Sequence, residues 1–148
     1  MIREMVLSDI EEIAEIEKKC FNDAWSSESI RNDFLNNDLS VYYVDARDGK
    51  IAGYIFFWIT FDSATVVNIA VEEPYRRKGI AQDLLNRCVE KCEEEGCEYL
   101  TLEVRVSNSA AIAFYEKNGF MKVNVKKGYY TDNYEDALYM VKPLMVRL

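Results

Sequence analysis

The sequence predicts a single α/β domain with a mixed sheet, spanning residues 1–148, and three observations support this. The 148 residues, 49% hydrophobic and 30% charged, suit one domain with its own core, and no Ser/Gly/Pro-rich linker divides them. Residues 65–71, 80–95 and 99–105 read as strand, helix and strand, which predicts a βαβ unit with parallel strands. Asp48-Gly49 between two strand-like segments predicts a β-hairpin, because such a turn needs positive φ.

After an initial strand, the first half of the chain predicts two helices and three further strands. Apolar residues recur with helical spacing from Ile10 to Phe21, and Ser8 or Asp9 can cap this helix. Ser26 or Ser27 is expected to begin a second, short helix that runs through Phe34-Leu35. Strands are expected at residues 39–46, 51–61 and 65–71, where aromatic and β-branched residues gather.

The second half begins with the clearest helical pattern in the chain. Apolar residues at 80, 81, 84, 85, 88, 89 and 92 form one face, and Gly96 is suited to end the helix. A strand at 99–105 precedes a helix that opens at Asn108 and stops at Asn118-Gly119. Residues 120–127 and 134–142 are expected to form a final antiparallel pair. The predicted order is strand, two helices, three strands, helix, strand, helix and two strands.

Composition excludes several classes of protein. The acidic N-terminal segment lacks the apolar core of a signal peptide. The longest apolar run, residues 51–61, is too short to span a bilayer. We therefore expect a cytoplasmic protein without membrane or nucleic-acid partners. The net charge of −8 serves solubility or attracts a cationic partner. The chain has no histidine, so most zinc sites and any histidine-based triad are excluded, and no metal is expected. The cysteines at 20, 88, 92 and 97 are expected to be buried thiols, with a redox pair as the alternative.

Three cations, Arg76, Arg77 and Lys78, gather before Gly79 at the start of the helix at 80–95. A helix N-terminus presents free N–H groups and partial positive charge, and Gly79 and Ala81 let an anion approach the backbone. The stretch therefore suits a diphosphate, with a solvated basic turn as the alternative. Its spacing matches neither the GxGxxG motif nor the Walker motif.

The motif R-R-K-G-I-A at 76–81 resembles the R/Q-x-x-G-x-G/A signature of the GNAT superfamily of N-acetyltransferases, and the element order resembles this family throughout. LEVRVSNSAAI at 102–112, FYEKNGF at 114–120 and GYY at 128–130 look most like the ribosomal-protein alanine N-acetyltransferases of the RimI type. The resemblance implies a central, mostly antiparallel sheet with a parallel βαβ unit and helices on both faces. It also implies acetyl-CoA as co-substrate.

The same resemblance implies roles for individual residues. The diphosphate of acetyl-CoA would bind the backbone and side chains of residues 76–81, namely Arg76, Arg77, Lys78, Gly79, Ile80 and Ala81. The pantetheine arm would pair with the backbone of Ile69, Ala70 and Val71, and the Val71 N–H would stabilise the oxyanion. Glu103 would accept the proton of the amine and Tyr115 would donate one to the thiolate. Asn108 would cap its helix and bind acetyl-CoA. On residue type alone, Glu103 could instead pair with Arg105.

The acceptor is expected to be a protein N-terminus, by resemblance that of a ribosomal protein. Trp25, Tyr129 and Tyr130 would flank the peptide channel. Here A-W-S replaces the family's P-W-S, and Lys126-Lys127-Gly128 stands where the family has an arginine-rich triplet. An α-amine titrates near ~7.7–8.0 and a lysine near ~10.4, so a lone glutamate is a better base for the α-amine.

Two other functions compete with this one. A small amine, such as a polyamine or an aminoglycoside antibiotic, could be the acceptor. A non-catalytic module that only binds acetyl-CoA belongs to a different class, but Glu103, Asn108 and Tyr115 are all present, which favours an enzyme. The oligomeric state is not predicted.

Overall fold

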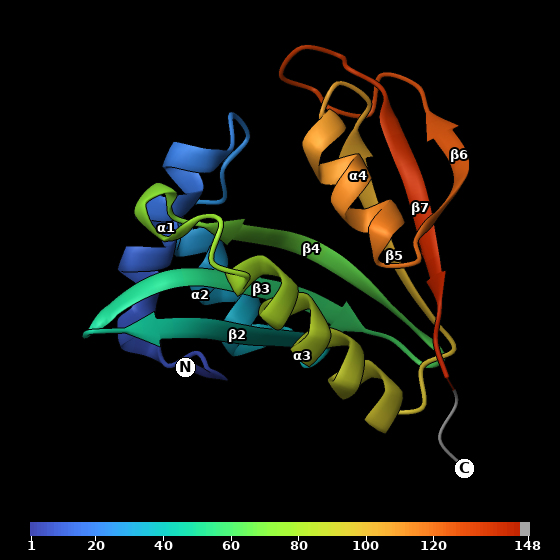
Figure 1. Ribbon diagram of the computed structural model, residues 1–148. Coiled ribbons are helices and arrows are strands. Elements are labelled where there is room, and N and C mark those ends of the chain that lie inside the picture. Colours follow the sequence, from blue (N-terminus) through green and yellow to red (C-terminus); the bar gives the residue numbers. More distant parts are fainter. Residues whose placement is uncertain (146–148) are drawn as a thin grey trace.

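A seven-stranded sheet forms the frame of the computed structural model, which describes residues 1–145 (Figure 1). The strands lie in the order β1-β2-β3-β4-β5-β7-β6. All neighbours are antiparallel except β4 and β5, which are parallel. The strands are β1 (Ile2–Glu4), β2 (Ser40–Arg47), β3 (Lys50–Ile59), β4 (Ser63–Val71), β5 (Tyr99–Arg105), β6 (Met121–Lys126) and β7 (Ala137–Pro143).

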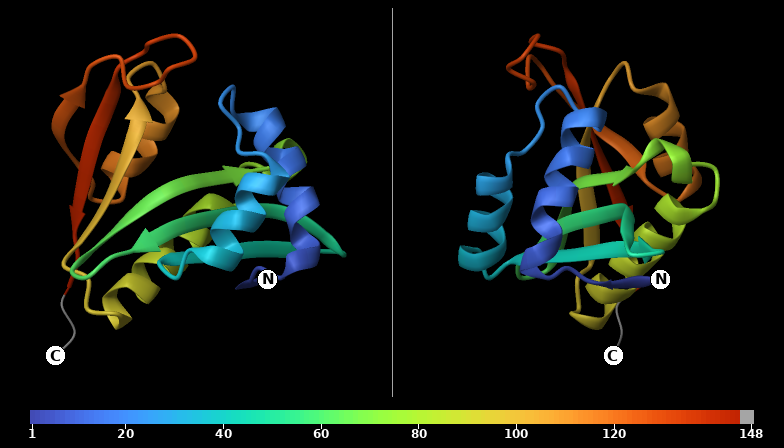
Figure 2. Two further views of the ribbon diagram at one scale, coloured as in Figure 1. Left: turned by 180° about the vertical axis from the view of Figure 1, so that it is seen from behind. Right: turned by 90° about the vertical axis from the view of Figure 1, so that its left-hand side faces the viewer.

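Helices cover both faces of this sheet, as the two views in Figure 2 show. The helices are α1 (Ile10–Cys20), α2 (Ser27–Asn36), α3 (Ile80–Glu94) and α4 (Ser109–Lys117), with short 3-10 turns at Leu7–Asp9 and Glu73–Tyr75. Two hydrophobic cores follow from this, one under α1 and α2 and the other under α3 and α4. Within residues 1–145 no helix is long and apolar enough to cross a bilayer.

Strand alternation divides the side chains of β2 and β3 between the two cores. Tyr42 and Tyr54 pack on the α1 and α2 side, whereas Tyr43 and Ile55 pack on the α3 side. Gly53 lies where α3 begins, and a Cβ there would meet the Ala70 carbonyl oxygen at 2.8 Å and Cγ2 of Ile80, the first residue of α3, at 3.3 Å. A glycine at this position therefore allows the start of α3 to lie close against the sheet.

The sheet opens between β4 and β5. Their parallel pairing covers only three residues of each strand, Ser63–Thr65 opposite Tyr99–Thr101, after which the strands spread apart (Figure 1). A register shift opposite Phe56 and Phe57 leaves Val67 bulged out of the β3–β4 ladder, and bulges bend a strand. Beyond Thr65, β4 has no strand partner on the side that faces β5. The sheet thus holds a wedge-shaped opening at its centre.

Most predicted elements are confirmed, including the single mixed domain, the βαβ unit and the two-sided helices. The hairpin at Asp48-Gly49 has positive φ at both residues, 52° and 75°. The cap predicted for the first helix is wrong, because the Asp9 carboxylate accepts hydrogen bonds from the N–H of Val6 and from Arg3 instead. The last strand begins at Ala137 rather than at 134, because Tyr134 adopts positive φ of 58° within a loop.

Candidate active site

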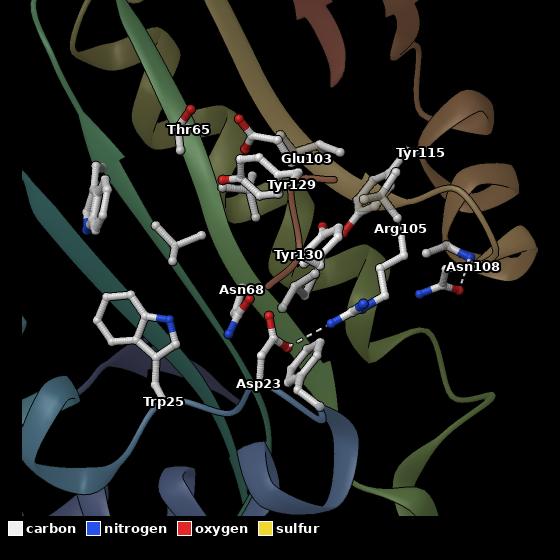
Figure 3. A pocket seen from close by; sticks show the side chains of 18 of the residues that line it. Asp23, Trp25, Thr65, Asn68, Glu103, Arg105, Asn108, Tyr115, Tyr129 and Tyr130 are labelled. Atoms are coloured by element: carbon white, nitrogen blue, oxygen red, sulfur yellow. Dashed lines mark hydrogen bonds and ion pairs between the residues drawn. The ribbon is translucent and has the colours of Figure 1, made fainter. Parts of the chain in front are cut away.

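A cavity of about 490 Å³ occupies the opening between β4 and β5 (Figure 3). Its walls are the middle of β4, the C-terminal half of β5, the start of α4, the loop between α1 and α2, and the loop between β6 and β7. Seven of the residues singled out by the sequence line it: Trp25, Ile69, Glu103, Asn108, Tyr115, Tyr129 and Tyr130. The topology brings residues far apart in the chain to one site.

Glu103 lies on β5 and turns its half-buried carboxylate toward this cavity. Its partner is Lys126 of β6, whose Nζ lies 2.6 Å from Oε1. The alternative pairing with Arg105 is not formed. Lys126 reaches Glu103 across β7, and its ammonium lies 4.8 Å from the centre of the Tyr139 ring. The Glu103 contact raises the pKa of Lys126, which keeps this ammonium charged.

Tyr115 and Asn108 face the cavity from α4. The Asn108 side-chain oxygen accepts a hydrogen bond from the Ala111 N–H at 3.2 Å, so the predicted N-cap is confirmed. Tyr115 is buried against Phe120, and burial raises the pKa of its phenol. A phenol with a raised pKa stays protonated at neutral pH.

Arg105, at the end of β5, joins the two loops that close the cavity. Its guanidinium contacts Asp132 at 2.8 Å and Glu135 at 3.3 Å, both in the β6–β7 loop. It also lies 4.0 Å from the centre of the Tyr130 ring and 3.6 Å from Asp23 in the α1–α2 loop. The dashed line in Figure 3 marks this contact with Asp23. Arg105 therefore fixes both loops to the strand that carries Glu103.

A fully buried carboxylate, Glu17 of α1, supports the α1–α2 side of the cavity. It accepts hydrogen bonds from the Trp25 backbone N–H at 2.9 Å, from the Tyr54 hydroxyl at 2.6 Å and from the Asn68 amide. Burial raises the pKa of Glu17. The Trp25 ring packs edge-to-face on Phe56, with 5.3 Å between ring centres. The predicted peptide-binding residue Trp25 is thus held by both its backbone and its ring.

The predicted diphosphate loop lies outside the cavity, at the N-terminus of α3. Gly79 has φ of 78° at the N-cap of α3, and Arg77 also has positive φ, 65°. Arg77 and Lys78 are exposed and make no hydrogen bond or salt bridge with residues 1–145. Arg76 differs from them, because its Nε donates to the Val71 carbonyl at 2.9 Å. Two of the three cations are therefore free to meet an anion, and Arg76 anchors the loop.

The loop at 76–81, the free edge of β4 and the cavity suit successive parts of acetyl-CoA. The unpaired edge of β4 ends at Val71, close in sequence to the loop at 76–81, and the strand's middle lines the cavity. Ile69 lines the cavity, whereas Ala70 and Val71 lie beyond it, toward the loop. An unpaired strand edge offers N–H and C=O groups to the amides of a pantetheine arm. The predicted oxyanion donor, the Val71 N–H, stays a prediction.

The profile of the acetyltransferase (GNAT) family matches residues 10–120, and the chain belongs to this family. It is therefore an acyltransferase whose co-substrate is acetyl-CoA. The ribosomal protein bS18-alanine N-acetyltransferase of Escherichia coli K12 is 34% identical over 149 residues, covering 97% of each chain. A Bacillus subtilis protein that carries this name provisionally is 41% identical over 139 residues, covering 94% of this chain and 92% of its own.

The fold of this chain is also similar to that of a protein of known crystal structure. The ribosomal-protein-S18-alanine N-acetyltransferase from Escherichia coli aligns with a TM-score of 0.90 at 31% identity. The alignment covers 100% of this chain and 96% of that one. The predicted membership in the GNAT superfamily, and the likeness to the ribosomal-protein branch, are confirmed.

Sequence reasoning missed several residues that build the site: Asp23, Asn68, Asp132, Glu135 and the buried Glu17. Each of these side chains contacts a partner that is distant in the chain. A single polar residue carries no local sequence pattern that would reveal such a contact. Glu17 offered the best hint, because it falls among the apolar positions of the α1 stripe. A carboxylate on the buried face of a helix usually has hydrogen-bonding partners.

Proposed function

We propose that this chain transfers the acetyl group of acetyl-CoA to the α-amine of a protein N-terminus, with a ribosomal protein as the acceptor. The observation that carries the proposal is the half-buried Glu103 carboxylate in a cavity walled by the free edge of β4 and by Tyr129-Tyr130. The names of the two bacterial relatives support the ribosomal acceptor. Both reactants belong to the cytoplasm, where we place the enzyme.

The proposed reaction uses four groups of this chain. Arg77, Lys78 and the amides after them bind the diphosphate, and the edge of β4 through Ile69 to Val71 orients the pantetheine arm. Glu103 accepts a proton from the α-ammonium, directly or through water. The neutral amine attacks the thioester carbonyl, the C–S bond breaks, and the Tyr115 hydroxyl protonates the leaving thiolate. The remaining excess proton of the new amide nitrogen passes through water to restore the Tyr115 hydroxyl.

The cavity also supports a peptide rather than a small amine. Its two entrance loops carry Trp25, Tyr129 and Tyr130, and the paired tyrosines meet edge-to-face with 5.1 Å between ring centres. Aromatic side chains of this kind supply contact area to a chain that extends away from the reacting amine. The acidic chain, with net charge −8, favours a basic peptide electrostatically.

A panel of acceptors tests the proposal. The chain is incubated with acetyl-CoA and peptides that carry ribosomal-protein N-termini, the same peptides with a blocked α-amine and a free lysine, and spermidine. We expect acetylation of the free α-amine, located by fragmentation mass spectrometry. Transfer to the lysine peptide or to spermidine alone contradicts the α-amine assignment, and binding of acetyl-CoA without any transfer favours the non-catalytic module.

A further inference from the structure

The ammonium of Lys126 lies beside the carboxylate that would have to take the proton of an acceptor amine. Its Nζ lies 2.6 Å from Oε1 of Glu103, and the ring centres of Tyr139 and Tyr129 lie 4.8 Å and 5.4 Å away. A carboxylate together with aromatic faces is a favourable environment for an alkylammonium. Glu103 and Tyr129 both line the cavity (Figure 3). A lysine of this chain thus reaches the group that we assign as the base.

We propose that Lys126 is itself an acetyl acceptor, so that the chain acetylates its own Lys126 at the Glu103 wall of this cavity. The inference rests on the proposed function, because it needs Glu103 as the base and acetyl-CoA as the donor. Lys126 Nζ gives a proton to Glu103 and attacks the acetyl carbonyl. The N–C bond forms, the thioester C–S bond breaks, and the thiolate leaves with the proton of Tyr115 as free CoA, while the second proton of Nζ passes through water to restore the Tyr115 hydroxyl. Glu103 then returns its proton to water.

Two opposing effects set the rate of this step. At neutral pH a lysine holds a neutral amine roughly 10²–10³ times less often than an α-amine does, and the contact with Glu103 lowers that fraction further. Holding a reactant in place can supply an effective concentration on the order of 10⁵ M or more in well-oriented systems. The balance predicts self-acetylation that is slow compared with peptide transfer but selective for one lysine.

Lys127, the next residue in the chain, provides an internal control. Its side chain is 84% exposed, against 38% for Lys126, and it pairs with Asp136 at the surface. Chemical acetylation by acetyl-CoA in solution should favour the more exposed lysine. Enzymatic self-acetylation should favour Lys126, and the ratio of the two distinguishes the routes within one wild-type sample.

The experiment incubates the full chain with acetyl-CoA and no peptide, and follows each lysine by digestion and mass spectrometry. We expect Lys126 to be acetylated at least tenfold faster than Lys127, at a rate per chain that does not depend on protein concentration. Equal rates at the two lysines, or a rate per chain that rises with protein concentration, overturn self-acetylation within the chain. In Glu103→Gln we expect Lys126 to fall to the level of Lys127, while Glu116→Gln, exposed on α4, behaves as wild type.

A second reaction, with an N-terminal peptide added, distinguishes this inference from the function on which it rests. If an N-terminal peptide is acetylated while Lys126 stays unmodified through many turnovers, the inference fails and the proposed function stands. If acetyl-CoA binds but neither the peptide nor Lys126 is acetylated, both fail. Lys126→Arg keeps a cation beside Glu103 and cannot be acetylated under these conditions, so it must lose the modification at this position.

Discussion

Glu103 pairs with a cation and still faces the cavity. It is half-buried on β5, and the ammonium of Lys126 at 2.6 Å balances its charge without closing the cavity in front of it. A carboxylate that is to accept a proton must be ionised before the acceptor arrives. The Lys126 ammonium stands directly beside the oxygen that would take up that proton.

Glu103→Gln should lower the turnover number for peptide acetylation by about 10²–10⁴, the usual contribution of general base catalysis. A glutamine has the same shape but cannot take up the proton. The affinity for acetyl-CoA should stay the same, because Glu103 is remote in sequence and element from the loop at 76–81. Initial rates and calorimetric titration measure the two effects, with Glu116→Gln as the matched control. A turnover number within twofold of wild type removes Glu103 from the mechanism.

Glu17 gives a prediction about pH and stability. Burial raises its pKa in the folded protein above the ordinary value of 4.5. As the pH rises from about 4.5 through the folded pKa, the unfolded chain releases this proton first. The carboxyl group therefore stabilises the fold most below pH 4.5, and that contribution is lost as the pH increases through the folded pKa.

The comparison with Glu17→Gln isolates this effect, because the variant has no proton to release there. Urea unfolding of both proteins at several pH values should show wild type losing stability relative to the variant as the pH rises above about 4.5. A difference in unfolding free energy that is independent of pH, or one that grows the other way, contradicts the raised pKa.

Arg105 contacts two loops that are far apart in the chain. One guanidinium holds Asp132 and Glu135 of the β6–β7 loop and reaches Asp23 of the α1–α2 loop. Isolated ion pairs at a surface contribute little, but here several contacts converge on a side chain that is only 19% exposed. Without it, both loops lose their link to β5.

Arg105→Ala should raise the KM for the acceptor peptide roughly tenfold or more, equivalent to about 1.4 kcal/mol, with little change in the KM for acetyl-CoA. Arg105→Lys keeps the charge but not the forked geometry, and should recover only part of the loss. Steady-state kinetics with each substrate varied in turn measures this split, and Arg87→Ala on α3 is the control. If both KM values rise together, Arg105 supports the whole fold rather than the acceptor loops.

The elements themselves could be predicted, because they follow local patterns. The spacing of apolar residues marked α3, and Asp48-Gly49 marked its hairpin through the positive φ that such a turn needs. The partners of the site residues had no comparable pattern. The only partner that residue type suggested for Glu103 was Arg105, as an alternative, yet its partner Lys126 reaches it from β6, across an intervening strand. Contacts of this kind depend on strand order, which only the folded chain defines.

On the scale of the whole molecule, exposed cations and carboxylates lie at opposite ends of the site. The chain carries a net charge of −8, yet Arg77 and Lys78 stand exposed at the start of α3, and neither makes a salt bridge with a carboxylate of residues 1–145. The carboxylates Asp23, Asp132 and Glu135 lie around the other entrance. The arrangement favours an anionic donor at one end of the β4–β5 opening and a cationic acceptor at the other.

Binding of acetyl-CoA should therefore stabilise the whole fold through its diphosphate. At about 100 times the dissociation constant, a ligand that binds only the folded chain adds about 2.7 kcal/mol, which raises the Tm of a chain of this size by roughly 5–10 °C. Acetyl-pantetheine, which carries the same thioester and arm but no diphosphate, should give a much smaller rise at the same concentration.

Arg77→Ala should shrink the acetyl-CoA shift toward the acetyl-pantetheine value, because it removes an exposed cation beside the free amides of α3. Lys50→Ala, which removes an exposed cation at the hairpin between β2 and β3, is the matched control and should leave the shift unchanged. Differential scanning fluorimetry over a range of ligand concentrations measures all four cases. Equal shifts with acetyl-CoA and acetyl-pantetheine would show that the diphosphate contributes nothing, and the anion site at α3 would then be wrong even if the acetyl group is still transferred.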